Sequence, residues 1–286
     1  MKKYVPHLCV LASGVLWGLI GLCNRRLTAA GLSVGSIVLI RNLGSMLLLG
    51  LLFAIRDPKI FRIRWKHVPI FLGTGVVSVR LFTLCYFTCQ KLCSLAVAAV
   101  LLYTSPAFVV ILSAILWKDK LTKRKLLALI MAFLGCTFVT GFWSGDVSVS
   151  LQGAVLGVAS GLFYGLYSIF GRSALEHYKP FTVTFYTFLF AGLGALAVLR
   201  PAELAAGLSQ PGVALTALTL IVVCTVAPYL LYTFGLAGMD SGKAAILASV
   251  EPVTAAVVGV LAFGEPMRAA VLLGLGCILA CVYILK

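Results

Sequence analysis

The chain has 286 residues, of which 62% are hydrophobic and only 11% are charged, and its formal net charge is +15. Its mean hydropathy of +1.10 leaves too little polar surface to cover a water-soluble fold, so the composition favours a membrane protein. A nucleic-acid partner is not expected, because the basic residues lie between apolar stretches rather than on one shared face.

Ten apolar stretches follow one another along the chain, separated by short polar breaks. Most approach the roughly 20 apolar residues that a helix needs to cross a bilayer. The predicted spans are 5–23, 34–55, 68–89, 95–117, 126–143, 151–170, 182–199, 213–234, 244–263 and 269–285. The longest breaks, 56–67 and 200–212, are too short for a soluble domain, so any function must reside in the helix bundle.

Basic residues in the breaks are distributed unevenly between the two sides of the membrane. The side of the N-terminus holds Lys2, Lys3, Arg56, Lys59, Arg62, Arg64, Lys66, Lys118, Lys120, Lys123, Arg124, Lys125, Arg172, Lys179, Lys243 and Lys286. The other side holds only Arg25, Arg26, Lys91, Arg200 and Arg268. An excess of lysine and arginine marks the cytoplasmic side. The sequence therefore predicts a multi-pass protein of the cytoplasmic membrane, with both termini in the cytoplasm.

Neither a metal site nor an enzyme active site is expected. Cys85, Cys89 and Cys93 follow helical spacing, but no histidine or carboxylate lies near them in sequence, so apolar packing is the better interpretation. Residues 31–35 spell a Gly-x-Ser-x-Gly nucleophile elbow, which has mechanical meaning only on a strand-to-helix turn and here falls in a short loop. The Walker-like string around Lys243 is incomplete, so energy must come from gradients or exchange. We therefore expect no catalytic residue and no cofactor.

Two pairs of segments repeat at almost the same displacement. Residues 12–25 match 159–172 at six of fourteen positions, and residues 98–106 match 244–252, so the displacements are 147 and 146 residues. Two separate matches at nearly one displacement are hard to attribute to compositional bias. The chain therefore contains an internal repeat.

Each copy of the repeat holds five predicted helices, an odd number, so the two copies enter the membrane in opposite directions. We predict an all-α membrane protein of ten transmembrane helices, an inverted repeat of two five-helix bundles over residues 1–146 and 147–286. Two halves related by a pseudo-two-fold axis in the membrane plane can exchange conformations and open one cavity to each side in turn. Carriers use this property.

These residues resemble the drug/metabolite transporter superfamily, in its ten-helix branch built from two EamA-type domains. The resemblance covers almost the whole chain and rests on Trp17, Gly18, Arg41, Pro106, Asp119, Glu251, Pro252 and Glu265. The chain departs from an even repeat at Tyr164, which stands where the first half has Trp17, and at Lys118, which stands where the second half has Gly264. The resemblance implies a central cavity lined mainly by helices one, three, four, six, eight and nine.

Three charged residues lie within predicted spans: Arg80, Glu251 and, less deeply, Arg41. Such residues usually face a cavity or a partner, because charge in hydrocarbon is costly. Glu251 could titrate during transport, which would make a proton the coupling ion, or it could pair permanently with Arg41 or Arg80.

Polar stripes run along two predicted helices that are equivalent in the repeat. Arg80, Thr83, Tyr86 and Gln90 form the first stripe, and Thr225, Tyr229 and Tyr232 form the second. We expect the stripes to line opposite walls of one central cavity. The alternative is that the tyrosines fill packing space or anchor the helices at the membrane interface.

Pro106 and Pro252 interrupt two spans at corresponding positions, which frees backbone carbonyls at matching depths. Paired interrupted helices point to a carrier's binding region. Candidate contacts around the prolines are Tyr103, Thr104, Ser105 and Ser249, and candidate aromatic contacts on the matched first and sixth helices are Trp17, Tyr164 and Tyr167. A simple kink at the prolines and core filling by the aromatic rings are the competing interpretations.

These observations predict a secondary transporter that moves small organic metabolites, amino acids or related amphipathic solutes, by alternating access. Arg41 or Arg80 would bind a carboxylate, Glu251 would face an amine, and the aromatic rings would cover the apolar body of the solute. The alternative substrates are phosphorylated sugars, nucleotide-type metabolites or drugs, moved by an exporter or exchanger. A channel or a membrane scaffold would explain the inverted repeat less directly.

Overall fold

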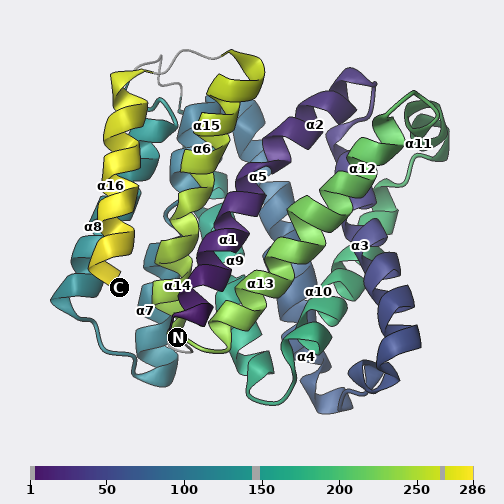
Figure 1. Ribbon diagram of the computed structural model, residues 1–286, viewed down its shortest axis with the longest axis horizontal. Helices are drawn as coiled ribbons and strands as arrows, with labels where there is room; N and C mark the ends of the chain where they lie inside the picture. The colour runs from purple at the N-terminus through teal and green to yellow at the C-terminus, as the bar shows by residue number, and fades with distance from the viewer. Residues whose placement is uncertain (1–3, 144–148, 265–267, 286) are drawn as a thin grey trace.

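The computed structural model describes residues 4–143, 149–264 and 268–285 and shows a bundle of helices (Figure 1). The helices are α1 (Val5–Gly18), α2 (Ile20–Ala29), α3 (Val34–Arg56), α4 (Val68–Leu72), α5 (Phe82–Leu92), α6 (Leu95–Leu102), α7 (Ser105–Trp117), α8 (Lys123–Val139), α9 (Leu151–Leu175), α10 (Pro180–Ala195), α11 (Pro201–Leu208), α12 (Val213–Ile221), α13 (Ala227–Leu236), α14 (Ser241–Leu247), α15 (Glu251–Phe263) and α16 (Ala269–Leu285). Wider π-helical turns at Gly73–Leu81 and Val222–Val226 join α4 to α5 and α12 to α13.

Short polar side chains set where several helices begin. The residue before the first turn accepts a backbone N–H of that turn at Ser33, Ser94, Thr122, Ser150 and Asp240. Such caps satisfy one of the backbone donors that a helix start leaves unpaired. Pro106 and Pro252 lie in the first turns of α7 and α15, where a missing N–H costs nothing, so each proline begins the second half of an interrupted span.

Within the part of the chain that the structure describes, seven helical stretches are long and apolar enough to cross a membrane, namely Val5–Ala29, Val34–Arg56, Trp65–Leu92, Leu95–Trp117, Leu151–Leu175, Val213–Leu236 and Ser241–Phe263. Two shorter apolar helices are α10 and α16. The remaining predicted span, 126–143, coincides in part with α8, which has 17 residues and begins with three basic ones. The multi-pass membrane architecture is thus supported, while the count of ten spans stays a prediction.

The first helices of the two predicted repeats run in opposite directions. In Figure 1, α1 and α2 lead from the N-terminus to the opposite end of the bundle, and α3 returns toward α4. His67, just before α4, stacks on His177, just after α9, with ring centroids 4.4 Å apart. Helix α9 therefore finishes on the side of the bundle where α1 begins, and we call this side the N-terminal end.

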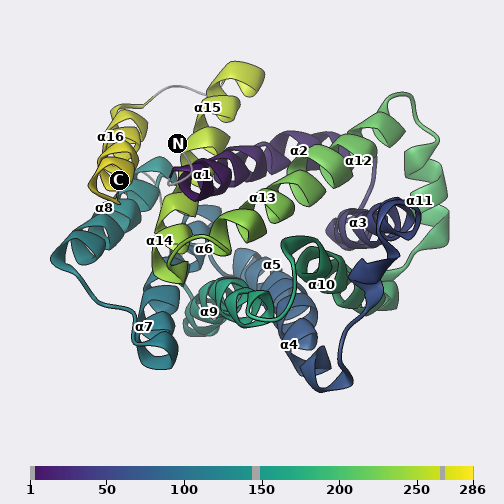
Figure 2. The same ribbon diagram turned by 60° about the horizontal axis from the view of Figure 1, so that its bottom comes forward.

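The predicted repeat relates contacts between helices to equivalent contacts elsewhere in the bundle. It makes α1 equivalent to α9, α5 to α13 and α3 to α10. Helix α1 packs on α13 and α9 packs on α5, while α3 packs on α10. Helices α8 and α16 lie side by side at one edge of the bundle (Figure 1, Figure 2). The two interrupted spans also end alike, because Lys118 and Gly264 both adopt left-handed backbone conformations, with φ of 56° and 65°.

Gly18 lets α1 approach α15 closely. A Cβ atom at this position would lie 2.5 Å from Cβ of Thr254 and 2.8 Å from the carbonyl oxygen of Glu251. We expect Gly18→Ala to lower the unfolding temperature, because overpacking costs about 1–3 kcal/mol. Gly21→Ala is the matched control, since nothing lies within 4 Å of a Cβ there. Thermal unfolding of the two detergent-purified variants checks this, and equal unfolding temperatures would contradict it.

Candidate functional site

A central cavity of about 350 Å³ lies between α1, α2, α3, α5 and α15. Its polar lining side chains are Asn24, Arg41, Asn42, Thr83, Tyr86, Gln90, Tyr103 and Glu251. Aromatic rings of Trp17, Phe82 and Phe87 complete much of the wall. The lining includes Asn24 of α2 and Gln90 near the end of α5, and α2 lies toward the end of the bundle opposite the N-terminal end (Figure 1). The cavity therefore extends from the middle of the bundle toward that opposite end.

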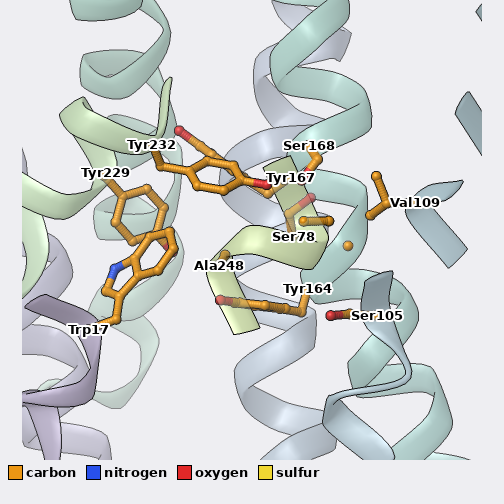
Figure 3. Close-up of a pocket in the computed structure, with 12 residues that line it drawn as sticks. Trp17, Ser78, Ser105, Val109, Tyr164, Tyr167, Ser168, Tyr229, Tyr232 and Ala248 are labelled. Carbon is orange, nitrogen blue, oxygen red and sulfur yellow. Dashed lines mark hydrogen bonds between the residues drawn. The ribbon is translucent and has the colours of Figure 1, made fainter. Parts of the chain in front are cut away.

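Four aromatic side chains, Trp17, Tyr167, Tyr229 and Tyr232, pack together beside this cavity, and we call them the aromatic plug (Figure 3). The Trp17 ring lies 5.2 Å from Tyr229 and 5.4 Å from Tyr232, and Tyr167 lies 5.1 Å from Tyr229. Tyr167 and Tyr232 also share hydrogen bonds of 2.7 Å with Thr233 and Ser168. The space left among these side chains is about 20 Å³, close to the room one water needs.

The predicted aromatic site residues border two different spaces, the central cavity and the small space inside the aromatic plug. Trp17 borders both the cavity and the plug, while Tyr167, Tyr229 and Tyr232 border only the space in the plug. All four side chains are buried. In this conformation Tyr167, Tyr229 and Tyr232 pack in the aromatic plug, and their contact with a solute stays a prediction.

Glu251 occupies the first position of α15 and faces the cavity. A short 3₁₀ turn, Ala248–Val250, breaks the span just before it, so the carboxylate lies at a helix N-terminus, where negative charge is favoured. The Tyr164 hydroxyl donates a hydrogen bond of 3.2 Å to Oε2 of Glu251. Among the residues that the structure describes, Glu251 forms no salt bridge, so permanent pairing with Arg41 or Arg80 is not observed.

The two predicted arginines lie in different surroundings. Arg41, on α3, lines the cavity close enough to Glu251 and Tyr229 to interact with both electrostatically. Arg80 lies in the π-helical turns, and its aliphatic part is 3.8 Å from the Cβ position of Gly194 on α10. Arg80 is not among the lining residues of the cavity. The wider turns change which face of the helix each residue occupies. Thr83, Tyr86 and Gln90 therefore line the cavity, while Arg80 does not.

The residues around the helix breaks are divided among three environments. Tyr103 lines the cavity, and Ser105 borders the space in the plug together with Tyr164. The Thr104 hydroxyl donates to the Leu101 carbonyl at 2.6 Å, and Thr104 is not among the lining residues of the cavity. Ser249 is buried and borders neither space.

The nucleophile-elbow motif at residues 31–35 forms a helix start. Ser33 caps α3, and its backbone N–H donates a hydrogen bond of 2.5 Å to Glu203 of α11. This backbone hydrogen bond, with the hydroxyls of Ser33 and Ser36, lowers the pKa of Glu203 to about 2. Ser33 therefore has a capping role, and no strand-to-helix turn is present there.

Polar contacts join the two predicted halves at the N-terminal end. Arg172 pairs with Asp119 at 2.5 Å, and Lys125 pairs with Asp240 at 2.9 Å. Asp119 follows Lys118 as Glu265 follows Gly264 in the repeat, and Glu265 lies outside the described residues. Elsewhere in the bundle, Cys23 and Cys224 bring their sulfur atoms within 3.9 Å of each other.

Comparisons with known proteins point in one direction. The EamA-like transporter family matches the chain twice, over residues 5–141 and 151–286. An uncharacterised transporter of Archaeoglobus fulgidus is 31% identical over 252 residues, which cover 86% of this chain and 89% of that relative. The uncharacterised transporter YwfM of Bacillus subtilis is 23% identical over 279 residues, covering 96% of this chain and 91% of YwfM. One solved crystal structure matches with a TM-score of 0.80 at 18% identity, covering 99% of this chain and 96% of that one, which shows the fold alone.

Proposed function

Because this chain belongs to the EamA-like transporter family, we propose that it is a secondary transporter of small organic metabolites, amino acids or related amphipathic solutes. The resemblance to the drug/metabolite transporter superfamily is confirmed by the two family matches and by relatives named as transporters. A membrane transporter requires a lipid bilayer and a small-molecule substrate.

Alternating access by an inverted repeat of ten spans is part of the proposal. Three observations support it. The family matches the chain twice, α1 and α9 run in opposite directions, and the contact of α1 with α13 has an equivalent in the contact of α9 with α5. The proposed boundary between residues 146 and 147 falls outside the described residues.

We place the N-terminal end of the bundle in the cytoplasm of a cell whose cytoplasmic membrane holds the protein. Most of the basic loop residues lie on that side, which supports this orientation. Lys2, Lys3 and Lys286 belong to the same group but lie outside the described residues. On this assignment the aromatic plug closes the cytoplasmic side of the cavity.

The proposed substrate class rests on one observation: two side chains of opposite charge line the cavity and do not form a salt bridge with each other. Arg41 and Glu251 both face the space, and within the described chain neither belongs to a salt bridge. Each is therefore available to an opposite charge on a solute, while the aromatic walls suit an apolar body. A substrate with both a carboxylate and an amine satisfies this arrangement.

Transport in proteoliposomes tests the proposal. A thermal-shift screen of purified protein against a metabolite panel first selects the solute. We then expect saturable uptake of the labelled solute that is accelerated by unlabelled solute inside the vesicles. Linear, unsaturable uptake would indicate a channel. Selection of phosphorylated sugars, nucleotides or drugs in place of amino acids would replace the substrate but keep the carrier.

A further inference from the structure

Buried polar atoms without hydrogen-bond partners gather at one wall of the central cavity. They are Nε1 of Trp17, Nε of Arg41, and both Nδ2 and Oδ1 of Asn42. The side chain of Asn42 is nearly enclosed, since the residue is only 1% exposed, and Trp17 is 6% exposed. All three residues nevertheless line the cavity. Asn42 was not anticipated as a site residue from the sequence.

Such atoms are rare in folded proteins, because a buried donor or acceptor without a partner costs about 1–3 kcal/mol. Three of the four atoms, those of Trp17, Arg41 and the Asn42 amide nitrogen, are N–H donors. The donors belong to residues of two helices, α1 and α3, that line the same cavity. A ligand that supplied acceptors here would satisfy them together. A donor-rich wall that includes one arginine favours an oxyanion.

The charges of the cavity decide which oxyanion fits. Arg41 is the only cationic side chain among its described lining residues, and Glu251 contributes a negative charge to the same space. A phosphate dianion would therefore meet one positive and one negative group. A carboxylate carries a single negative charge, and its two oxygens can accept from separate N–H donors.

We propose that Trp17, Arg41 and Asn42 form a carboxylate subsite, in which Asn42 distinguishes a carboxylate from its neutral amide. This inference rests on the proposed function, since it assigns one end of the proposed substrate. Asn42 donates through Nδ2 to one carboxylate oxygen, and its Oδ1 accepts from the neighbouring ammonium group. Glu251 faces the same ammonium group from the opposite helix.

Binding of the standard amino acids and of their α-carboxamides to the full-length protein in nanodiscs tests the subsite. We expect at least one amino acid to bind about tenfold or more tightly than its own amide. Asn42→Ala should weaken binding of that amino acid about tenfold and weaken binding of the amide less, because a hydrogen bond to a carboxylate is stronger than one to a neutral carbonyl. Asn42→Asp should weaken the acid still further, because it adds a negative charge. Trp17→Phe removes the indole N–H together with part of the ring that packs on Tyr229 and Tyr232, and it should give a smaller loss than Asn42→Ala.

Retained binding of the amide shows that each variant is folded. Equal losses for acid and amide, or no loss for either, would overturn the carboxylate subsite, and an ordered water would then be the partner of Asn42. Saturable counterflow would survive that outcome, so the proposed transporter would stand. If no amino acid bound and glucose 6-phosphate bound instead, both the subsite and the proposed substrate would be wrong.

Discussion

Glu251→Gln is expected to lower the affinity for an amine-bearing solute about 10- to 100-fold, because a hydrogen bond to a charged group is lost. Glutamine keeps the shape of the side chain and can still accept from the Tyr164 hydroxyl, which lies 3.2 Å from Oε2. The variant therefore isolates the negative charge. If Glu251 carries the coupling proton, the substitution also removes the dependence of uptake on a pH gradient. Gradient-driven uptake in proteoliposomes measures both effects.

Two further variants separate the charge of Glu251 from its surroundings. Glu251→Asp keeps the charge on a shorter side chain and should retain proton-dependent uptake at reduced affinity. Tyr164→Phe removes one hydrogen bond and should have a smaller effect than Glu251→Gln. A Glu251→Gln protein with full, pH-dependent transport would eliminate Glu251 as the coupling group.

Asp240→Ala is expected to cost about 3–5 kcal/mol of stability, because it leaves a buried lysine without its counter-charge. The Lys125 side chain is only 3% exposed, and its Nζ lies 2.9 Å from Asp240. Asp240 also caps α14, since its Oδ1 accepts the backbone N–H of Lys243 at 3.0 Å. Asp240→Asn keeps this cap and loses only the charge, so it should be more stable than Asp240→Ala by about 1 kcal/mol. Denaturation of the purified variants measures the difference.

A double substitution and a pH series complete this test. Replacing Lys125 by methionine in the Asp240→Asn protein should recover much of the loss, because no buried charge then lacks a partner. Although burial alone would raise it, hydrogen bonds from Lys125 and Lys243 hold the pKa of Asp240 below its ordinary value. A lowered carboxyl pKa stabilises the fold above the unfolded-state pKa, and this contribution is lost as pH falls through the lowered value. A double variant no more stable than Asp240→Asn would rule out the ion pair as the cause.

Hydropathy was sufficient to locate the helices but not their internal irregularities. The seven long apolar stretches coincide with predicted spans, because the length and the apolar composition that a bilayer requires can both be read from sequence. The π-helical turns at Gly73–Leu81 depend on tertiary packing, where Gly73 adjoins Phe170 and Gly75 adjoins the Thr187 carbonyl. An ideal helical period therefore placed Arg80 in the cavity stripe, while the structure places it at α10.

The candidate site could be predicted only in part from sequence. Charge within an apolar helix identified Arg41 and Glu251, which do line the cavity. Tyrosine suits both a cavity wall and a packed core, so no pattern could assign Tyr229 and Tyr232 to the aromatic plug. Asn42 carries no charge, so charge within an apolar helix could not identify it.

The close approach of Cys23 and Cys224 gives this chain a native proximity probe. The two sulfur atoms lie 3.9 Å apart, one on α2 of the first half and one in the second half. A disulfide needs about 2.05 Å, so only a modest displacement would let an oxidant join them. A covalent link there would tether the halves to each other without any engineered thiol. For the same reason, cysteine-scanning work on this protein has to begin by replacing this pair.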